Sequence, residues 1–295
     1  MSYAEKMEYV TLNNGVKMPL VGLGVMRVQD EDCVSYVKKA LEVGYRLIDT
    51  ARVYYNEEYV GRAIEESPVP REELFLTTKM WITDAGYEKT KESIRDSLKK
   101  LRTDYLDLVI IHMCSGDYYG TYRAMMEFYE QGKIRALGVS NFGPERLVDI
   151  CLFNKVPPMV NQVETNLFFQ QHEFHDLMKK YNVHQEAWGP LAQERVMEIV
   201  NHPVLKEIGD KYGKTAVQVA LRHTVQRGIT IIPKSDTLET MTQNIDLFDF
   251  TLTDEEMEII NQLDEKRSFK SDYGNYQSAE YAASELRGDE DKMFK

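Results

Sequence analysis

Residues 47–61 read LIDTARVYYNEEYVG and contain one complete strand–loop–helix unit. An apolar run ends at Asp49, a short loop carries Tyr54, and the residues that follow have the spacing of a helix. Barrel and open-sheet folds often place their chemistry at the carboxyl end of a strand, in the loop before the next helix. The carboxylate and the phenol are therefore candidate functional groups.

Similar apolar runs recur along the chain and alternate with helical patterns. In residues 30–43, for example, Val34, Val37, Ala40 and Leu41 fall on one helical face. The alternation predicts one domain, residues 1–295, folded as a parallel (β/α)8 TIM barrel. A doubly wound open sheet is the alternative, but eight units of about 30 residues fit closure better. The expected strands are 19–23, 45–49, 73–78, 105–111, 134–139, 159–163, 183–187 and 229–232.

Both ends of the chain add elements to this repeat. Asn14-Gly15, between short alternating runs in residues 8–18, predicts an N-terminal β-hairpin that can act as a lid on one end of the fold. Thr253, followed three residues later by Glu256, is a capping-box signature for an extra C-terminal helix. Residues 264–295 are polar and charged, and we expect a tail that wraps the barrel or is partly mobile.

Composition excludes several classes of partner. A net charge of −12 and a pI of about 5.1 disfavour binding to nucleic acid or to anionic membranes. The three cysteines are widely spaced and predict no disulfide framework. No apolar segment resembles a signal peptide or a membrane span, so we expect a soluble, cytoplasmic protein, and a monomer.

Polar side chains follow the expected strands, at the rim where a barrel keeps its active site. Any one of them is more often a cap or a satisfied core residue, but the joint pattern is harder to explain by chance. They are Asp49, Tyr54, Lys79, His112, Ser140, Asn141, Gln162, Glu164, Trp188, Lys234 and Ser235.

These groups suggest proton transfer coupled to attack on a carbonyl. A phenol has a pKa of roughly 10, and a neighbouring ammonium lowers it by stabilising the phenolate. Lys79 can be that neighbour, and Asp49 can pair with Lys79 and keep it charged. His112 can orient the substrate oxygen, and Tyr54 is then the general acid.

The sequence predicts no metal site. His172 and His175 lie three apart in HEFH rather than in HExxH, and we interpret them as surface residues. No Ser–His–Asp arrangement competes with the rim residues.

A hydride donor would complete the chemistry. GLGVMR at 22–27 lacks the third glycine of a dinucleotide fingerprint, because Arg27 stands there. The segment PKS at 233–235 fits phosphate better, since Lys234 precedes a helix that has Ser235 near its N-cap. Trp188 offers a flat face for a nicotinamide ring, and Ser140, Asn141 and Gln162 offer donors and acceptors for its carboxamide.

Eight motifs follow one another along the chain: DTARVY at 49–54, NEEYVG at 56–61, TTKMW at 77–81, DYLDLVIIH at 104–112, GKIRALGVSNF at 132–142, NQVE at 161–164, AWGPL at 187–191 and IPKS at 232–235. In this order and spacing they resemble the aldo-keto reductase superfamily from about residue 8 to residue 265. Within it, the segment 112–127 and Trp188 look most like the bacterial reductases that include the 2,5-diketo-gluconate reductases.

This resemblance implies NADPH-dependent reduction of aldehydes or ketones by a catalytic tetrad of Asp49, Tyr54, Lys79 and His112. It implies a substrate site formed by Met26, Tyr54, Tyr55, Trp81, His112 and Met113. The implied cofactor site consists of Gly24, Val25, Met26, Asp49, Ser140, Asn141, Gln162, Trp188, Gly189, Pro190, Leu191, Gln193, Lys234, Ser235, Thr240, Gln243 and Asn244.

Some positions depart from the family pattern. Thr240 stands where an arginine often grips the 2′-phosphate of NADPH, so use of NADH is possible as well. Met26, Tyr55, Met113 and Cys114 replace residues usual near the substrate mouth and suggest an apolar, adaptable pocket.

Two other functions are compatible with the same scaffold. One is a cofactor-binding regulatory protein without strong catalysis. The other is a lyase or isomerase in which Lys79 forms a Schiff base, although that reading leaves Asp49 and Tyr54 without a role.

Overall fold

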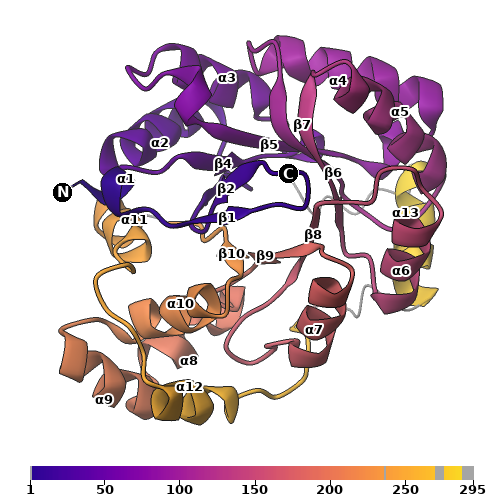
Figure 1. The fold of residues 1–295 in the computed structure, drawn as a ribbon. Helices are drawn as coiled ribbons and strands as arrows, with labels where there is room; N and C mark the ends of the chain where they lie inside the picture. The colour runs from indigo at the N-terminus through magenta and orange to yellow at the C-terminus, as the bar shows by residue number, and fades with distance from the viewer. Residues whose placement is uncertain (1, 236, 270–275, 288–295) are drawn as a thin grey trace.

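Parallel strands form a barrel surrounded by helices in the computed structural model, which describes residues 2–235, 237–269 and 276–287 (Figure 1). The strands follow one another around the barrel in chain order, from β3 to β10. Their bounds are β3 Leu23–Gly24, β4 Leu47–Asp49, β5 Phe75–Met80, β6 Leu106–Ile111, β7 Ile134–Ser140, β8 Val160–Glu164, β9 His184–Trp188 and β10 Thr230–Ile231. The predicted barrel is confirmed, with strand ends shifted by a few residues.

The barrel closes between its first and last strands. Val21 forms a parallel bridge with Ile231, whose carbonyl accepts a hydrogen bond from Gly22 N at 2.8 Å. A Cβ atom at Gly22 would lie 2.2 Å from Cδ2 of Leu47, so glycine permits this close approach. The glycines at 22 and 24 thus serve closure, and β3 starts later than the expected strand 19–23.

Helices pack around the barrel with one apolar side inward. The predicted apolar face of residues 30–43 is the buried side of α2, which spans Asp30–Val43. The other helices around the strands are α3 Glu57–Glu65, α4 Tyr87–Lys100, α5 Tyr118–Glu130, α6 Pro144–Leu152, α7 His172–Lys180, α8 Val196–Val200, α9 Pro203–Tyr212, α10 Ala216–Gln226 and α11 Leu238–Ile245. Short 3-10 turns are η1 Arg52–Tyr54, η2 Arg71–Glu73, η3 Ile82–Asp84 and η4 Gln193–Arg195.

The predicted hairpin covers the end of the barrel where the strands begin. Its strands β1 Tyr9–Thr11 and β2 Lys17–Pro19 are antiparallel, and a short helix, α1 Tyr3–Lys6, precedes them. The Asn13 amide donates to the carbonyls of Pro158 and Asn182 at 3.1 and 2.9 Å, and Asn14 donates to Arg135 O at 2.8 Å. These acceptors stand near the starts of three strands, so the hairpin tip is tied across the barrel floor.

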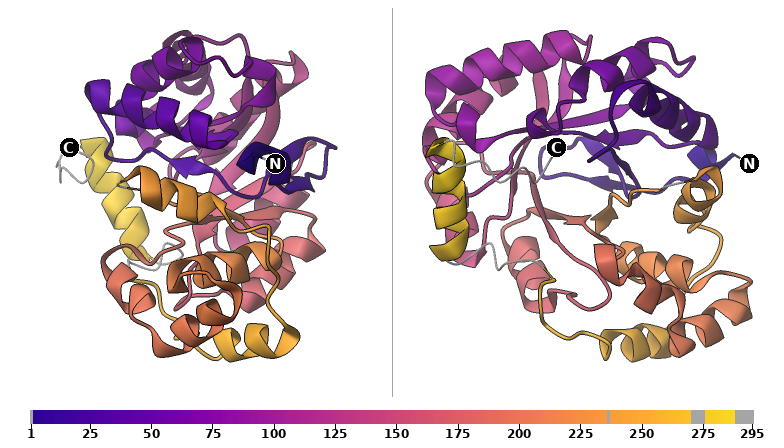
Figure 2. Two further views of the ribbon diagram at one scale, coloured as in Figure 1. Left: turned by 90° about the vertical axis from the view of Figure 1, so that its left-hand side faces the viewer. Right: turned by 180° about the vertical axis from the view of Figure 1, so that it is seen from behind.

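The C-terminal region supplies two more helices. The predicted helix is α12, Asp254–Asn261, and its capping box joins Thr253 and Glu256 as expected. The helix α13, Tyr276–Arg287, packs against η3 at the end of the barrel opposite the hairpin (Figure 2, left). The described part of the predicted tail therefore wraps the barrel, while residues 270–275 and 288–295 lie outside the described residues.

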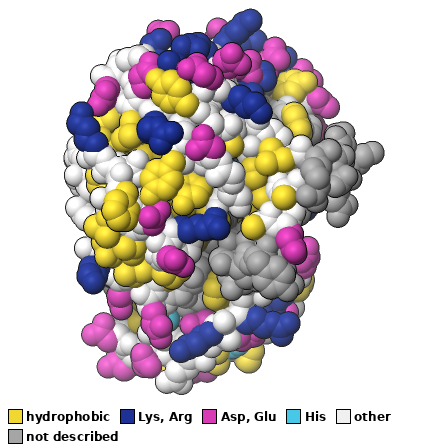
Figure 3. All heavy atoms as spheres, turned by 90° about the vertical axis from the view of Figure 1, so that its right-hand side faces the viewer, with side chains coloured by type: hydrophobic (Ala, Val, Ile, Leu, Met, Phe, Trp, Pro, Cys, Tyr) yellow, Lys and Arg dark blue, Asp and Glu magenta, His cyan; other side chains and the backbone are white. Residues whose placement is uncertain are grey.

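The outer surface mixes charges of both signs. The face shown in Figure 3 carries lysine, arginine, aspartate and glutamate side chains interspersed with hydrophobic ones, without a broad basic area. No helix within the described ranges has the length and apolar character needed to cross a membrane. Cys33, Cys114 and Cys151 are all free thiols.

Candidate active site

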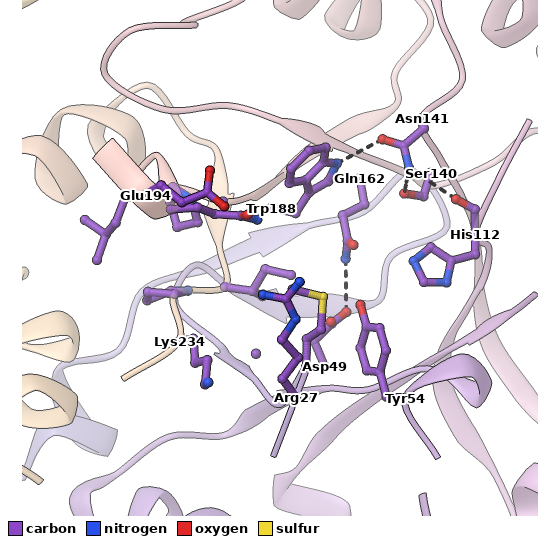
Figure 4. A pocket seen from close by; sticks show the side chains of 18 of the residues that line it. Arg27, Asp49, Tyr54, His112, Ser140, Asn141, Gln162, Trp188, Glu194 and Lys234 are labelled. Carbon is purple, nitrogen blue, oxygen red and sulfur yellow. Dashed lines mark hydrogen bonds between the residues drawn. The ribbon is translucent and has the colours of Figure 1, made fainter. Parts of the chain in front are cut away.

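A cavity of about 470 Å³ opens at the carboxyl ends of the strands, and residues from every strand or the loop after it line the cavity (Figure 4). Asp49, Tyr54 and His112 lie together on one side, and Trp188 and Lys234 stand on other walls. The side chains predicted at separate strand ends are thus brought to one place.

A buried ion pair lies at the base of this cavity. Lys79 Nζ donates to the Asp49 carboxylate and to the carbonyl of Thr50, the latter at 3.1 Å. Lys79 is fully buried and Asp49 is 2% exposed. Burial is the largest single effect and would lower the pKa of Lys79, but Asp49, Tyr54 and Glu186 together outweigh burial, so the net pKa is raised. The pairing predicted from sequence is present, and it keeps the ammonium charged.

The phenol of Tyr54 stands beside this ammonium. Lys79 Nζ lies 5.1 Å from the centroid of the Tyr54 ring, and Tyr54 is 7% exposed. Burial raises the pKa of Tyr54, Lys79 lowers it, and the net pKa is above 10.0. Lys79 therefore lowers the Tyr54 pKa, as expected, but burial has the larger effect and sets the net direction.

Arg52 fixes the turn that carries Tyr54. Its guanidinium donates to Asp84 at 3.0 Å and to Asp96 at 2.9 Å. Asp84 also accepts a hydrogen bond from the backbone N of Trp81 at 3.0 Å. One arginine thus joins the turn bearing Tyr54 to the turn bearing Trp81.

His112 follows β6 and packs between two aromatic rings. Its ring centroid lies 5.8 Å from that of Tyr54 and 4.9 Å from that of Trp81, both edge to face. Burial, and then the Lys79 charge, lower the pKa of His112 well below 6.5. The imidazole is therefore neutral near pH 7.

A row of polar side chains continues along the strands from His112. Asn141 donates from Nδ2 to the carbonyl of His112 at 3.2 Å and to Ser140 Oγ at 3.1 Å. Its Oδ1 accepts from Trp188 Nε1 at 2.9 Å. This bond fixes the indole of Trp188 at the cavity wall. Gln162 also lines the cavity, and it donates to Asp49 Oδ2 at 3.0 Å.

Most of the remaining residues of the predicted cofactor site also line the cavity. A Cβ atom at Gly24 would lie 3.0 Å from Ile232 O, a tight contact that glycine avoids. Val25 is fully buried behind the wall. The predicted residues that do line the cavity are Gly24, Met26, Gly189, Pro190, Leu191, Gln193 and Lys234.

Beyond Lys234, the residues of the predicted phosphate end lie at and near the start of α11, outside the cavity lining. Thr237 is the N-cap of α11, and Thr240 completes its capping box, with Thr240 Oγ1 donating to Thr237 O at 3.0 Å. Ser235 Oγ accepts from the buried Asn244 at 2.9 Å, and Gln243 is on the same helix. Exposed Lys234 reaches the cavity from this side.

The predicted substrate residues divide into two groups. Met26, Tyr54, Trp81, His112 and Met113 line the cavity. Ala282 of α13 packs in the same buried cluster as Trp81 and Met113, so the C-terminal helix borders this mouth.

Tyr55 lies apart from these residues. It is 68% exposed, has a left-handed backbone with φ 56°, and does not line the cavity. The turn directs Tyr54 inward and its neighbour outward, so the structure places one of the two adjacent phenols in the site.

Sequence reasoning missed several residues around the cavity. Arg27 comes from a loop and Glu194 from the short 3-10 turn η4, and neither segment is long enough to carry a periodic signal. Glu186 is fully buried beneath the cavity, and its place two residues before Trp188 on β9 could have revealed it, because side chains two apart share a strand face. The other lining residues not foreseen are Val196, Ile232 and Pro233.

One histidine differs from expectation. His175 is 7% exposed rather than at the surface, and its Nδ1 lies 2.8 Å from Gln185 Oε1. In the part of the chain that the structure describes, no group of three or more His, Cys, Asp or Glu side chains is placed to hold a metal.

Comparisons with known proteins point to one family. The model described as the Aldo/keto reductase family matches residues 20–265. Glyoxal reductase of Bacillus subtilis is 44% identical over 256 residues, covering 86% of this chain and 92% of that protein. The 9,11-endoperoxide prostaglandin H2 reductase of Trypanosoma cruzi is 43% identical, covering 90% and 95%. Methylglyoxal reductase DkgA of Escherichia coli K12 is 38% identical, covering 89% and 96%.

Solved structures agree. An aldo-keto reductase enzyme from a Medee basin deep-sea metagenome library, MGS-M4, has a TM-score of 0.88 and 46% identity, covering 90% of this chain and 98% of that one. An aldo-keto reductase of Bombyx mori, solved in complex with NADP, has a TM-score of 0.83 and 33% identity, covering 91% and 99%. In the present chain the half-buried indole, the polar row beside it and the cationic Lys234 form a donor set that suits a nicotinamide dinucleotide.

Proposed function

The chain belongs to the aldo/keto reductase family, and on that premise we propose that it reduces aldehydes or ketones with NADPH, using Tyr54 as the general acid. The observation that carries the proposal is the convergence of Tyr54, His112 and the Lys79–Asp49 pair at one cavity wall. Bound NADPH would supply the hydride that the carbonyl carbon receives.

The proton comes from Tyr54. Because the pKa of the buried phenol lies above 10.0, Tyr54 keeps its proton throughout the neutral range and is ready to donate. As the substrate oxygen gains negative charge, that proton moves to it and a phenolate remains. The Lys79 ammonium, held by Asp49, stabilises the phenolate.

His112 orients the carbonyl. Its neutral ring can carry a proton on a nitrogen facing the cavity and donate it as a hydrogen bond to the substrate oxygen. Trp81 and Tyr54 fix the ring plane from two sides. The hydrogen bond grows stronger as the oxygen gains charge, which favours the transition state over the bound substrate.

We assign the cofactor to the wall formed by Trp188, Gln162, Ser140 and Asn141, with its phosphates toward Lys234. The indole face supports the nicotinamide ring, and the polar row recognises its carboxamide. Lys234 and the N-terminal end of α11 attract the phosphates. With Thr240 in place of an arginine, NADH remains a second possible donor.

The Schiff-base alternative has less support. An ammonium that is paired with Asp49 and has a raised pKa is a poor nucleophile. A regulatory protein would not require a phenol, an ammonium and a neutral imidazole at one point of the cavity.

A substrate panel tests the proposal. Purified protein is mixed with NADPH or NADH and with glyoxal, methylglyoxal, a sugar-derived ketone or an aromatic aldehyde, and loss of absorbance at the reduced nicotinamide band is followed. We expect carbonyl-dependent oxidation of NADPH. Cofactor binding without turnover of any carbonyl would instead support the regulatory alternative, and a borohydride-trapped adduct on Lys79 would support the lyase.

A further inference from the structure

Glu186 is a buried carboxyl group that the proposed reaction does not use. It lies on β9, directly paired in register with Gln162 of β8 and with Thr230 of β10. It is fully buried, and among the described residues its Oε1 has no hydrogen-bond partner. A carboxyl group in such a place needs a reason, because burying an unpaired polar atom is costly.

Gln162 connects Glu186 to the ion pair. The Nε2 of Gln162 donates to Glu186 Oε2 at 2.9 Å and to Asp49 Oδ2 at 3.0 Å. An amide has only two N–H donors, and both are taken by carboxyl oxygens. The end of the amide left for the cavity is therefore its carbonyl oxygen.

The charges around Glu186 indicate that it holds a proton. One cation, Lys79, faces two carboxyl groups, and its ammonium is bonded to Asp49. Burial, and then the Asp49 charge, raise the pKa of Glu186 to about 8. Tyr54 and Lys79 both have pKa values raised above 10, so Glu186 is the group in this cluster that changes charge nearest to pH 8.

We propose that Glu186 is a positioning residue for the cofactor: together with Asp49 it holds the Gln162 amide so that the amide oxygen faces the cavity and accepts a hydrogen bond from the nicotinamide carboxamide. The proposal rests on the proposed function. If the amide were reversed, its oxygen would face the Asp49 carboxylate, which has no proton to donate, and the amide N–H groups would face the cavity instead.

The same residue links cofactor redox state to pH. Ionised Glu186 places a negative charge near the nicotinamide site, where it attracts the cationic ring of NADP⁺ and not the neutral ring of NADPH. Binding of NADP⁺ should therefore tighten relative to NADPH as pH rises from 6.5 to 9, and it should release a proton.

Glu186→Gln tests this link. The variant keeps the shape and an oxygen that accepts from Gln162, but it cannot ionise. Dissociation constants for NADP⁺ and NADPH are measured by protein fluorescence from pH 6.5 to 9. In the wild type the ratio of the NADP⁺ to the NADPH constant should fall about threefold or more, and in Glu186→Gln it should stay flat.

Glu57→Gln is the matched control, because Glu57 is also buried but binds Thr78 at 2.7 Å, away from the cavity. In this variant the ratio of the two dissociation constants should depend on pH as it does in the wild type. The pH link is overturned if this ratio depends on pH as strongly in Glu186→Gln as in the wild type, or if it does not depend on pH in the wild type.

Glu186→Leu tests positioning separately, since leucine removes the acceptor. It should raise the KM for NADPH with a smaller change in kcat, and Glu186→Gln should restore KM. Equal KM values in all three proteins would overturn the positioning role even when turnover is normal. Failure of the wild type to bind either cofactor would instead refute the proposed function itself.

Discussion

The indole nitrogen of Trp188 donates a hydrogen bond to Asn141 Oδ1 at 2.9 Å, so a side chain at the end of β9 is anchored to the residue that follows β7. Phe269 meets the same indole edge to face, with 5.8 Å between ring centroids. The segment bearing Phe269 is itself fixed, because its backbone N and Ser268 Oγ both donate to buried Glu164. The flat surface proposed for the nicotinamide is therefore set before any ligand binds.

Phe269→Ala tests that support without altering a cavity-lining residue. Loss of the aromatic contact should weaken NADPH binding about two- to tenfold, since an aromatic pair contributes about 0.5–1.5 kcal/mol in addition to the burial of its surface area. Fluorescence titration measures the change, and kcat at saturating NADPH should stay near that of the wild type. Phe153→Ala, which truncates a phenylalanine that is 75% exposed, is the control. Equal affinity in both variants would mean that the Phe269 contact does not support the cofactor site.

Tyr54→Phe removes the proposed proton and keeps the ring. Turnover of a generic aldehyde should fall about 10²- to 10⁴-fold, while NADPH binding survives. Tyr55→Phe makes the same change on the adjacent, exposed phenol and should retain wild-type turnover. Near-normal activity in Tyr54→Phe would refute the mechanism, and a loss in Tyr55→Phe would return Tyr55 to the substrate site.

The barrel and the ion pair could be predicted because both follow from chain order. In a barrel whose strands run consecutively, β4 and β5 must be neighbours, and Asp49 pairs in register with Thr77. Lys79 lies two residues further on, on the same face of its strand, so its meeting with Asp49 follows from alternation alone. Apolar spacing likewise predicted the buried face of α2.

Burial and backbone angles could not be read in this way. The pKa of Tyr54 depends on how completely the fold encloses the phenol, and the orientation of Tyr55 depends on a left-handed residue at the end of η1. His175 is a partial exception, because it shares the buried side of α7 with Met178, three residues on, and that spacing was available in the sequence. Arg27, in a loop, and Glu194, in the short turn η4, offered no such pattern.

Breaking the buried ion pair should be costly in stability. Lys79→Met leaves the Asp49 carboxylate buried without its cation, which should lower the free energy of unfolding by about 3–5 kcal/mol. The double variant with Asp49→Asn should recover part of that loss. Urea denaturation measures each value, and Lys155→Met, at a surface pair with Glu130, should cost about 1 kcal/mol or less. If the double variant lost as much stability as Lys79→Met and Asp49→Asn lose in sum, the two charges would not be coupled.

As pH falls, the protein should lose stability below about pH 6.5, well above the range in which ordinary carboxylates titrate. Burial is the main cause that depresses the pKa of His112, of His175 and His223 to about 4, and of His184 to about 3. The unfolded chain then takes up protons first, so stability is present above pH 6.5 and is lost as pH falls below it, by about 2 kcal/mol at pH 5 for each of His175, His184 and His223. Glu186 acts in the opposite sense, because its raised pKa favours folding as pH falls from 8 to 4.5.

Unfolding curves between pH 7 and 5 measure the sum of these effects. His175→Gln can keep the contact with Gln185 and removes one titrating group. The free energy of unfolding should therefore fall less between pH 7 and pH 5, by about the contribution of one histidine. A pH-independent midpoint in the wild type would contradict the burial of these rings.

Thr240→Arg tests the cofactor preference at the start of α11. Thr240 offers no cation to a 2′-phosphate, and its hydroxyl is already bonded within the capping box. A guanidinium there should raise the ratio of kcat/KM for NADPH to that for NADH by about tenfold or more, since a hydrogen bond to a charged group contributes about 1.5–3 kcal/mol. Thr242→Arg adds the same charge two residues further along α11, on another side of the helix, and should change the ratio less. If the two arginines act equally, general attraction of phosphate explains the gain; if neither acts, the 2′-phosphate is bound elsewhere.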